Sequence, residues 1–386
     1  MAHNIDFEDI RPFNDNEYHE KMASLIDEPS FKKVIATVMP EVDYDTFCKQ
    51  LLSINTINDF QKYIIIPFLD KLLKQTSDGL NIEGIECIDR DKNYVFMSNH
   101  RDIVIDATFL CRSLFMHDLD TCEIAIGSNL LIYQWITDLV RINKSFIVKR
   151  GVGVRQALEA AQQLSGYIHH AITEKHASVW IAQREGRAKD SNDRTQEALI
   201  KMLTLGCKGH ILDNISRLNI APLAISYEYD PCDSLKALEF LNKSKDPEFK
   251  KSPKDDLINM QSGIMGYKGR IYYHFTPCIN QELEQIDRNA DKATILSTVC
   301  STIDRHIHSG YHIFPCNYIA YDKLYKCDEF ASKYSAEEKA RFEEYLHKQI
   351  VKLGEFSAED YQFMLDKMLL MYSNPLKNKL AALQQS

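Results

Sequence analysis

The chain has 386 residues, 45% of them hydrophobic, which is enough to bury a sizeable core in two or three structural units. Its formal net charge of −9 excludes general nucleic-acid binding, because that affinity depends on lysine and arginine side chains that neutralise phosphates. Any anionic ligand must therefore meet a local cluster of basic residues.

Targeting and redox signals are weak in this sequence. The longest apolar runs, such as residues 63–69, fall well short of the roughly 20 residues that span a bilayer, so we expect no membrane-spanning helix. The N-terminus is acidic and lacks the basic start and apolar centre of a signal peptide. Ten scattered cysteines without a Cys-x-x-Cys predict reduced, mostly buried thiols. The expected compartment is the cytoplasm.

Residues 1–78 are predicted to form a helical N-terminal segment. They contain no glycine, and Phe47, Leu51, Ile54 and Ile57 recur at helical steps of three and four. The turn signal Ser-Asp-Gly at residues 77–79 ends this segment.

Residues 79–320 are predicted to form an α/β domain, because apolar strand candidates alternate there with helical segments. The strand candidates are residues 80–88, 93–99, 122–128, 144–150, 178–183, 219–228 and 270–277. Their apolar character indicates a largely buried sheet wrapped by helices.

The clearest helix covers residues 152–174, where Ala157, Leu158, Ala161, Leu164 and Ile168 form an apolar stripe. We assign this stripe to the core rather than to an acyl channel. Residues 321–386 form a helical C-terminal segment with predicted N-caps at its two serines, 335 and 357.

A His-Arg-Asp sequence at residues 100–102 also occurs in the catalytic loop of protein kinases. Such a loop needs an asparagine five residues after the aspartate, a glycine-rich loop upstream and an Asp-Phe-Gly downstream. Here Ala107 takes the asparagine position, no glycine precedes Gly79, and Asp-Phe-Gly is absent. The Gly-x-Ser-x-Gly elbow of serine hydrolases is absent as well, so neither class is favoured.

His306, His308, His312 and Cys316 have spacings that would suit a metal. A surface helix that runs into a loop explains them equally well, so we expect no metal site.

Acyl transfer from a thioester to a hydroxyl needs a base, and histidine has a suitable pKa near neutral pH. A neighbouring carboxylate fixes the imidazole tautomer and stabilises the imidazolium. His100 with Asp106 or Asp102 supplies such a pair. A phosphate-bearing acceptor also needs fixed cations, which "KSFIVKRG" (144–151) and "QREGRAKD" (183–190) offer.

The stretches "SNHRDIVID", "KSFIVKRG", "REGRAKD" and "APLAISYEY" follow one another in this order. Together they resemble the four sequence blocks of the glycerophospholipid acyltransferase superfamily, which includes glycerol-3-phosphate and lysophosphatidate acyltransferases. The resemblance covers about residues 79–229 and implies a mixed sheet wrapped by helices. It also implies that His100 is the general base, that Asp106 is its charge partner, and that Pro222 lies in the strand that shapes the acyl-donor side.

The resemblance further implies the binding residues. Lys149 and Arg150 match the basic residues of the second block, which contact the acceptor phosphate. Glu185, Gly186 and Arg187 match the third block, in which the glutamate orders the site and the basic residue meets phosphate.

Two features differ from the family pattern. Five residues rather than four separate His100 from Asp106, and Arg187 comes one residue early, so that Lys189 is a second candidate for its role. On a continuous helix His100 and Asp106 would lie about 9 Å apart along the axis, so His100 must precede the helix in a turn. An extended backbone would instead make Asp102 the partner.

Several polar residues also have a structural explanation. Asn99 and Asp102 suit helix caps, and Arg155, Arg184 and Arg194 are assigned to the surface.

The sequence thus predicts an O-acyltransferase that moves a fatty acyl group from acyl-carrier protein or acyl-coenzyme A to glycerol 3-phosphate or 1-acylglycerol 3-phosphate. No cofactor and no nucleic acid are expected. Its partners would be the thioester donor, the glycerol-phosphate acceptor and a membrane surface, which it would contact peripherally from the cytoplasm. Acylation of another lipid, such as an acylated amino acid, and an inactive lipid-binding relative remain alternatives.

Overall fold

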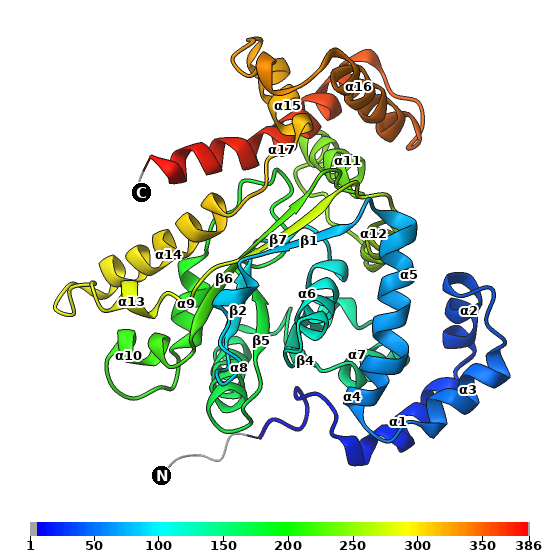
Figure 1. The fold of residues 1–386 in the computed structure, drawn as a ribbon, viewed down its shortest axis with the longest axis vertical. Coiled ribbons are helices and arrows are strands. Elements are labelled where there is room, and N and C mark those ends of the chain that lie inside the picture. The colour runs from blue at the N-terminus through cyan, green and yellow to red at the C-terminus, as the bar shows by residue number, and fades with distance from the viewer. Residues whose placement is uncertain (1–5, 385–386) are drawn as a thin grey trace.

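A computed structural model describes residues 6–384 of the chain (Figure 1). The N-terminal region is helical, and its hydrophobic cluster packs on the helix at 134–142. Phe47, Leu51, Ile54 and Ile57 are all buried there. The helical run is interrupted where Thr56 caps a new helix by accepting a hydrogen bond from the backbone N–H of Asp59. The helices are α1 (Asp15–Ile26), α2 (Pro29–Val38), α3 (Tyr44–Ser53), α4 (Ile57–Phe60) and α5 (Ile66–Thr76), with a π-helical turn at Gln61–Ile65 between the last two.

A seven-stranded sheet forms the centre of the molecule, in the order β1-β7-β6-β2-β5-β3-β4. Neighbouring strands pair in parallel except for β6 and β7, so the sheet is mixed, which confirms the predicted fold class. Each of the seven strand candidates contains one strand. The strands are β1 (Leu80–Glu83), β2 (Val95–Ser98), β3 (Glu123–Gly127), β4 (Ser145–Val148), β5 (Val179–Ala182), β6 (Ile220–Tyr227) and β7 (Ile271–Phe275).

The first strand candidate is longer than the strand it contains. Gly84 has a φ of +72°, and a Cβ there would lie 2.2 Å from the carbonyl oxygen of Phe275. Only glycine fits this close approach, and the chain leaves the sheet in a 3₁₀ turn at Ile85–Cys87.

Helices cover both faces of the sheet (Figure 1). Val95 and Met97 of β2 pack in the cluster of α8 and α14, whereas Phe96 between them packs in the cluster of α5 and α6. A strand buried on both faces gives a continuous apolar run in the sequence. The helices of this region are α6 (Ile105–Met116), α7 (Gln134–Ile142), α8 (Val154–Thr173), α9 (Glu197–Leu203), α10 (Ile211–Ser216), α13 (Asn280–Leu283) and α14 (Lys292–Ser309).

Two helices, α11 (Asp233–Lys245) and α12 (Pro253–Met265), are inserted between β6 and β7. The C-terminal helices α15 (Pro315–Tyr325), α16 (Ala336–Val351) and α17 (Ala358–Leu383) gather at the same end of the molecule, where α17 lies against α11, α14 and α15 (Figure 1). Ser335 and Ser357 cap α16 and α17, as predicted. Within residues 6–384 no helix has both the length and the apolar character needed to cross a bilayer.

The N-terminal segment runs beside the sheet at β4, which is an edge strand. The backbone N–H of Ile147 donates to the carbonyl of Ile10 over 2.9 Å. The ammonium of Lys149 pairs with Asp9, 2.5 Å away.

Candidate active site

The loop that follows β2 is fixed at both ends by side chains of its own. Asn99 is buried, and its amide exchanges two hydrogen bonds with the backbone of Ile225 on β6, at 2.8 and 2.9 Å. Asp102 accepts from the backbone N–H groups of Val104 and Ile105 and thereby begins α6. Asp102 therefore acts as a helix cap, while Asn99 anchors the loop to the sheet.

His100 lies in this loop ahead of α6, and Asp106 lies in the first turn of the helix. The Nδ1 atom of His100 is 2.8 Å from Oδ2 of Asp106. That oxygen also accepts from the backbone N–H groups of Arg101 and Asp102, at 2.6 and 2.9 Å. The turn before α6 thus accommodates the fifth residue between His100 and Asp106. The carboxylate beside the histidine belongs to Asp106 rather than Asp102.

The two carboxylates of the loop differ in their electrostatics. Burial would raise the pKa of Asp106, but hydrogen bonds from His100, the backbone and Tyr227 outweigh it and hold that pKa below its usual value. Burial and the charge of Asp106 raise the pKa of Asp102 instead. Asp106 therefore remains ionised beside the imidazole, as a charge partner must.

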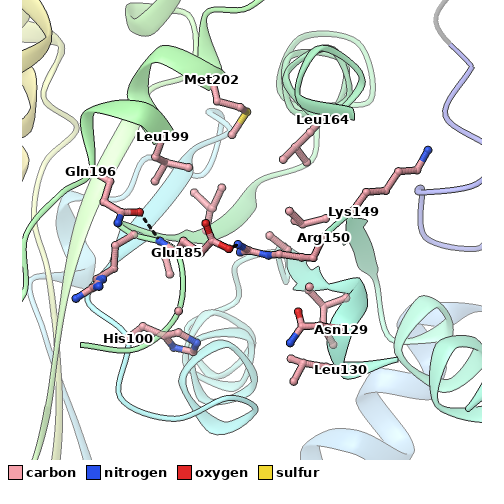
Figure 2. A pocket seen from close by; sticks show the side chains of 18 of the residues that line it. His100, Asn129, Leu130, Lys149, Arg150, Leu164, Glu185, Gln196, Leu199 and Met202 are labelled. Carbon is pink, nitrogen blue, oxygen red and sulfur yellow. Dashed lines mark hydrogen bonds and ion pairs between the residues drawn. The ribbon is translucent and has the colours of Figure 1, made fainter. Parts of the chain in front are cut away.

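His100 opens into a cavity of about 720 Å³. Its ring lies edge-on to the indole of Trp180 on β5, with 5.5 Å between the centroids. Because Nδ1 is shared with the carboxylate, Nε2 is the ring nitrogen that remains for a substrate proton. Figure 2 shows the imidazole at one side of the cavity, with Leu164, Leu199 and Met202 at the opposite side.

Cations from three parts of the chain line the same cavity, namely Lys149, Arg150, Arg184, Arg187, Lys189 and Lys251. Four of them pair with acids of this chain. Lys149 pairs with Asp9, Arg150 with Glu185, and both Lys189 and Lys251 with Glu239. Within residues 6–384, only Arg184 and Arg187 among these six lack a carboxylate within 4 Å, so their guanidinium groups are the ones left without an ion-pair partner.

Arg187 is held in place from the insertion between β6 and β7. Its Nη2 atom donates to the side-chain oxygen of Asn259 on α12 over 3.1 Å, and Nη1 is buried without an acceptor in the described chain. The turn before it requires Gly186, which has a φ of +67°. Lys189, the second candidate for this role, is occupied by Glu239.

Lys149 and Arg150 do not lie together as the sequence suggested. Figure 2 shows the Lys149 side chain directed away from His100, where its ammonium meets Asp9 and the amide oxygen of Gln163. Arg150 extends into the cavity and pairs with Glu185. Of the two, only Arg150 brings its charge toward the histidine.

The apolar stripe of α8 is only partly core. Leu164 and Ile168 are buried, but Leu158 is 55% exposed, and Ala157, Ala161 and Leu164 line the cavity. The interpretation of the stripe as core alone was therefore wrong for the first half of the helix, where its side chains line the cavity or are exposed.

Several residues of this site were not found from the sequence. Arg184, assigned to the surface, lines the cavity, and its position between a strand end and the Glu-Gly pair was an available signal. Lys251 and Tyr227 carried no local signal, because their partners in the site lie far away in the chain. Pro222 lies inside β6, where its carbonyl accepts from the hydroxyl of Thr276, and does not line the cavity.

The four residues with metal-like spacing each have a separate partner. His306 contacts Glu282, His308 the carbonyl of Asp193, and Cys316 the carbonyl of Glu228, whereas His312 stacks on Tyr272. Within residues 6–384 no group of three or more such side chains surrounds a common point.

One comparison with known proteins agrees with this chemistry. Residues 79–206, roughly a third of the chain, match the family model named Acyltransferase. This part of the chain is therefore an acyltransferase domain, in agreement with the resemblance to the glycerophospholipid acyltransferase superfamily. A comparison with curated proteins found no match.

Among solved structures, the chain is similar to the 1-acyl-sn-glycerophosphate (LPA) acyltransferase PlsC from Thermotoga maritima. The identity is 11%, the match covers 70% of this chain and 90% of that chain, and the TM-score is 0.33. Because this likeness is so distant, the assignment to a family rests on the family model and not on this structure.

Proposed function

We propose that the protein transfers an acyl group from acyl-coenzyme A or acyl-carrier protein to a hydroxyl of glycerol 3-phosphate or 1-acylglycerol 3-phosphate, in phospholipid synthesis. One observation carries the proposal: a histidine held by a buried carboxylate opens into the same cavity as an apolar wall and two arginines that have no carboxylate partner within the described residues. These three features match the reacting hydroxyl, the phosphate and the acyl chain of that reaction.

The chemistry follows from the dyad. Nε2 of His100 accepts the proton of the acceptor hydroxyl while its oxygen attacks the thioester carbonyl. A carbon–oxygen bond forms, the carbon–sulfur bond breaks, and the proton passes from Nε2 to the departing thiolate. Asp106 keeps the imidazole in the correct tautomer and stabilises the imidazolium, so no acyl-enzyme and no cofactor is needed.

Arg187 and Arg184 are the residues that we assign to the acceptor phosphate. A guanidinium matches the geometry of phosphate oxygens, and both side chains are free of carboxylates within the described part of the chain. In this proposal Arg150 and Glu185 form an ion pair between the dyad and the apolar wall, and Lys149 stays outside the phosphate site.

The acyl chain is assigned to the opposite side of the cavity, between α8 and α9. The apolar residues there are Ala157, Ala160, Ala161, Leu164, Leu199 and Met202. The lipid acceptor and the acylated product are amphiphiles, so we also propose that the protein works peripherally at a membrane surface that faces the cytoplasm.

The test is to supply the protein with radiolabelled acyl-coenzyme A or acyl-carrier protein and a panel of acceptors. The panel contains glycerol 3-phosphate, lysophosphatidate and an acyl amino acid. We expect label in a phosphate-bearing acceptor. His100→Ala should lower the rate about 10²- to 10⁴-fold, the usual contribution of a general base.

Charge removal separates the acceptor classes. Arg187→Gln should raise the KM for a phosphate-bearing acceptor about tenfold or more, because a charge-assisted hydrogen bond is lost. Arg155→Gln is the matched control, because that side chain is 94% exposed and its ion pair is with Glu159, one turn along the same helix. Label in the acyl amino acid alone, or in no acceptor, would refute the proposal, and the latter would favour a lipid-binding protein without activity.

A further inference from the structure

The second oxygen of the Asp106 carboxylate has a partner on the sheet. While Oδ2 receives His100 and two backbone N–H groups, Oδ1 accepts a hydrogen bond of 2.8 Å from the hydroxyl of Tyr227. Tyr227 is the last residue of β6, lies 121 positions along the chain from Asp106, and is 7% exposed. We propose that Tyr227 is a positioning residue, which orients the His100–Asp106 dyad and tunes the basicity of its histidine; this rests on the proposed function.

Tyr227 supplies what the loop alone lacks. The two backbone N–H groups of the loop and the imidazole all meet Oδ2, so none of them holds Oδ1 against rotation of the carboxylate about its Cβ–Cγ bond. A donor on Oδ1 fixes the plane and therefore the direction of the Nδ1 hydrogen bond. The backbone carbonyl of Asp106 is held in turn by the hydroxyl of Tyr273 on β7, at 2.9 Å.

The hydroxyl of Tyr227 also changes the charge that the imidazole meets. Burial and the charge of Asp106 keep the pKa of Tyr227 well above its usual value, so the hydroxyl stays a donor throughout the working pH range. By sharing the negative charge of the carboxylate, it weakens the attraction between Asp106 and a protonated His100.

The titratable groups that surround this carboxylate come from three elements. Asp102 and His100 lie in the loop, Tyr227 lies on β6 and Tyr273 on β7. Within residues 6–384, only His100 and Tyr227 reach the carboxylate oxygens with their side chains. Loss of the Tyr227 hydroxyl should therefore leave more negative charge on the oxygen that faces the imidazole.

The experiment compares Tyr227→Phe with Tyr94→Phe. Tyr94 is another buried tyrosine of the sheet region, whose hydroxyl accepts from the backbone N–H of Asp89 and does not touch the dyad. We expect Tyr227→Phe to lower kcat about tenfold with little change in KM, and to shift the acidic limb of the kcat/KM profile to higher pH. Tyr94→Phe should lose a similar amount of thermal stability and leave kcat and the limb in place.

The imidazole of His100 can be followed without any turnover, by NMR titration of ¹³C-labelled histidine with His100→Gln for assignment. A higher His100 pKa in Tyr227→Phe than in the wild type supports the positioning role even if every acceptor fails. An unchanged pKa overturns it, as does an acidic limb that moves equally in Tyr94→Phe. Failure of the acceptors is then a failure of the proposed function alone.

Discussion

Gly263 on α12 faces the carboxylate that begins α6, so its replacement by alanine is a sensitive test of this arrangement. An added Cβ would lie 1.8 Å from Oδ2 of Asp102 and 2.7 Å from its Cγ. Asp102 is 1% exposed and caps α6 through its other oxygen, so it cannot move away without losing the cap. Asp106 is the second residue of that helix and would shift with it.

The magnitudes decide the sign of the effect. Glycine to alanine within a helix ordinarily stabilises by about 1 kcal/mol. Overpacking costs about 1–3 kcal/mol and a lost N-cap about 1 kcal/mol, so Gly263→Ala should be destabilised by about 1–3 kcal/mol overall. A displacement of the dyad by about 1 Å would also lower kcat roughly 10²-fold.

Urea unfolding and acyl transfer by the same preparation measure both effects. Gln261→Ala is the matched control, because it changes an exposed residue of the same helix. A Gly263→Ala protein that is more stable than the wild type would refute the proposed contact with Asp102. Lower stability with an unchanged kcat would show that α12 covers the loop without setting the geometry of the dyad.

Three further predictions concern other parts of the molecule. Burial and nearby Asp230 raise the pKa of Asp233 to about 6. The free energy of unfolding should therefore fall by up to about 3 kcal/mol as pH rises from about 4 through 6, because the buried carboxyl loses its proton. Urea unfolding of Asp233→Asn should lack this fall, and an identical pH dependence in both proteins would contradict the prediction. Ala161→Trp should lower kcat/KM for long acyl donors about tenfold or more and spare short ones, and an unchanged chain-length preference would place the acyl chain elsewhere. Lys149→Ala should lower the free energy of unfolding by less than about 1 kcal/mol and leave the KM for the acceptor unchanged, because the ammonium pairs with Asp9 near the surface. A strongly raised KM would show that Lys149 does bind the acceptor phosphate.

The sheet was predictable because its strands are buried on both faces. In β2, Phe96 lies on one face of the sheet and Val95 and Met97 on the other. Burial on both faces makes the strand a short, continuous apolar run in the sequence, which is typical of a buried strand. The end of β1 was less visible, because it depends on how closely Gly84 approaches the carbonyl of Phe275, more than 190 residues away.

The site was predictable in its residue types but not in their directions. Lys149 and Arg150 are neighbours at a strand end, and neighbouring side chains of a strand point to opposite sides. Only Arg150 therefore directs its charge toward His100, although both side chains line the cavity, and the sequence does not show that Asp9 lies where it can pair with Lys149. Similarly, the choice between Asp102 and Asp106 depends on the turn that brings Nδ1 of His100 to within 2.8 Å of the latter.

The segment that precedes α1 has a consequence for handling the protein. Its carbonyl at Ile10 satisfies a backbone N–H of β4, and Asp9 pairs with the lysine that follows this strand. β4 ends the sheet, and an uncovered edge strand is a template on which another chain can add. Deleting the residues before Asn14 would expose this edge, so such a shortened protein should tend to self-associate while its dyad remains intact.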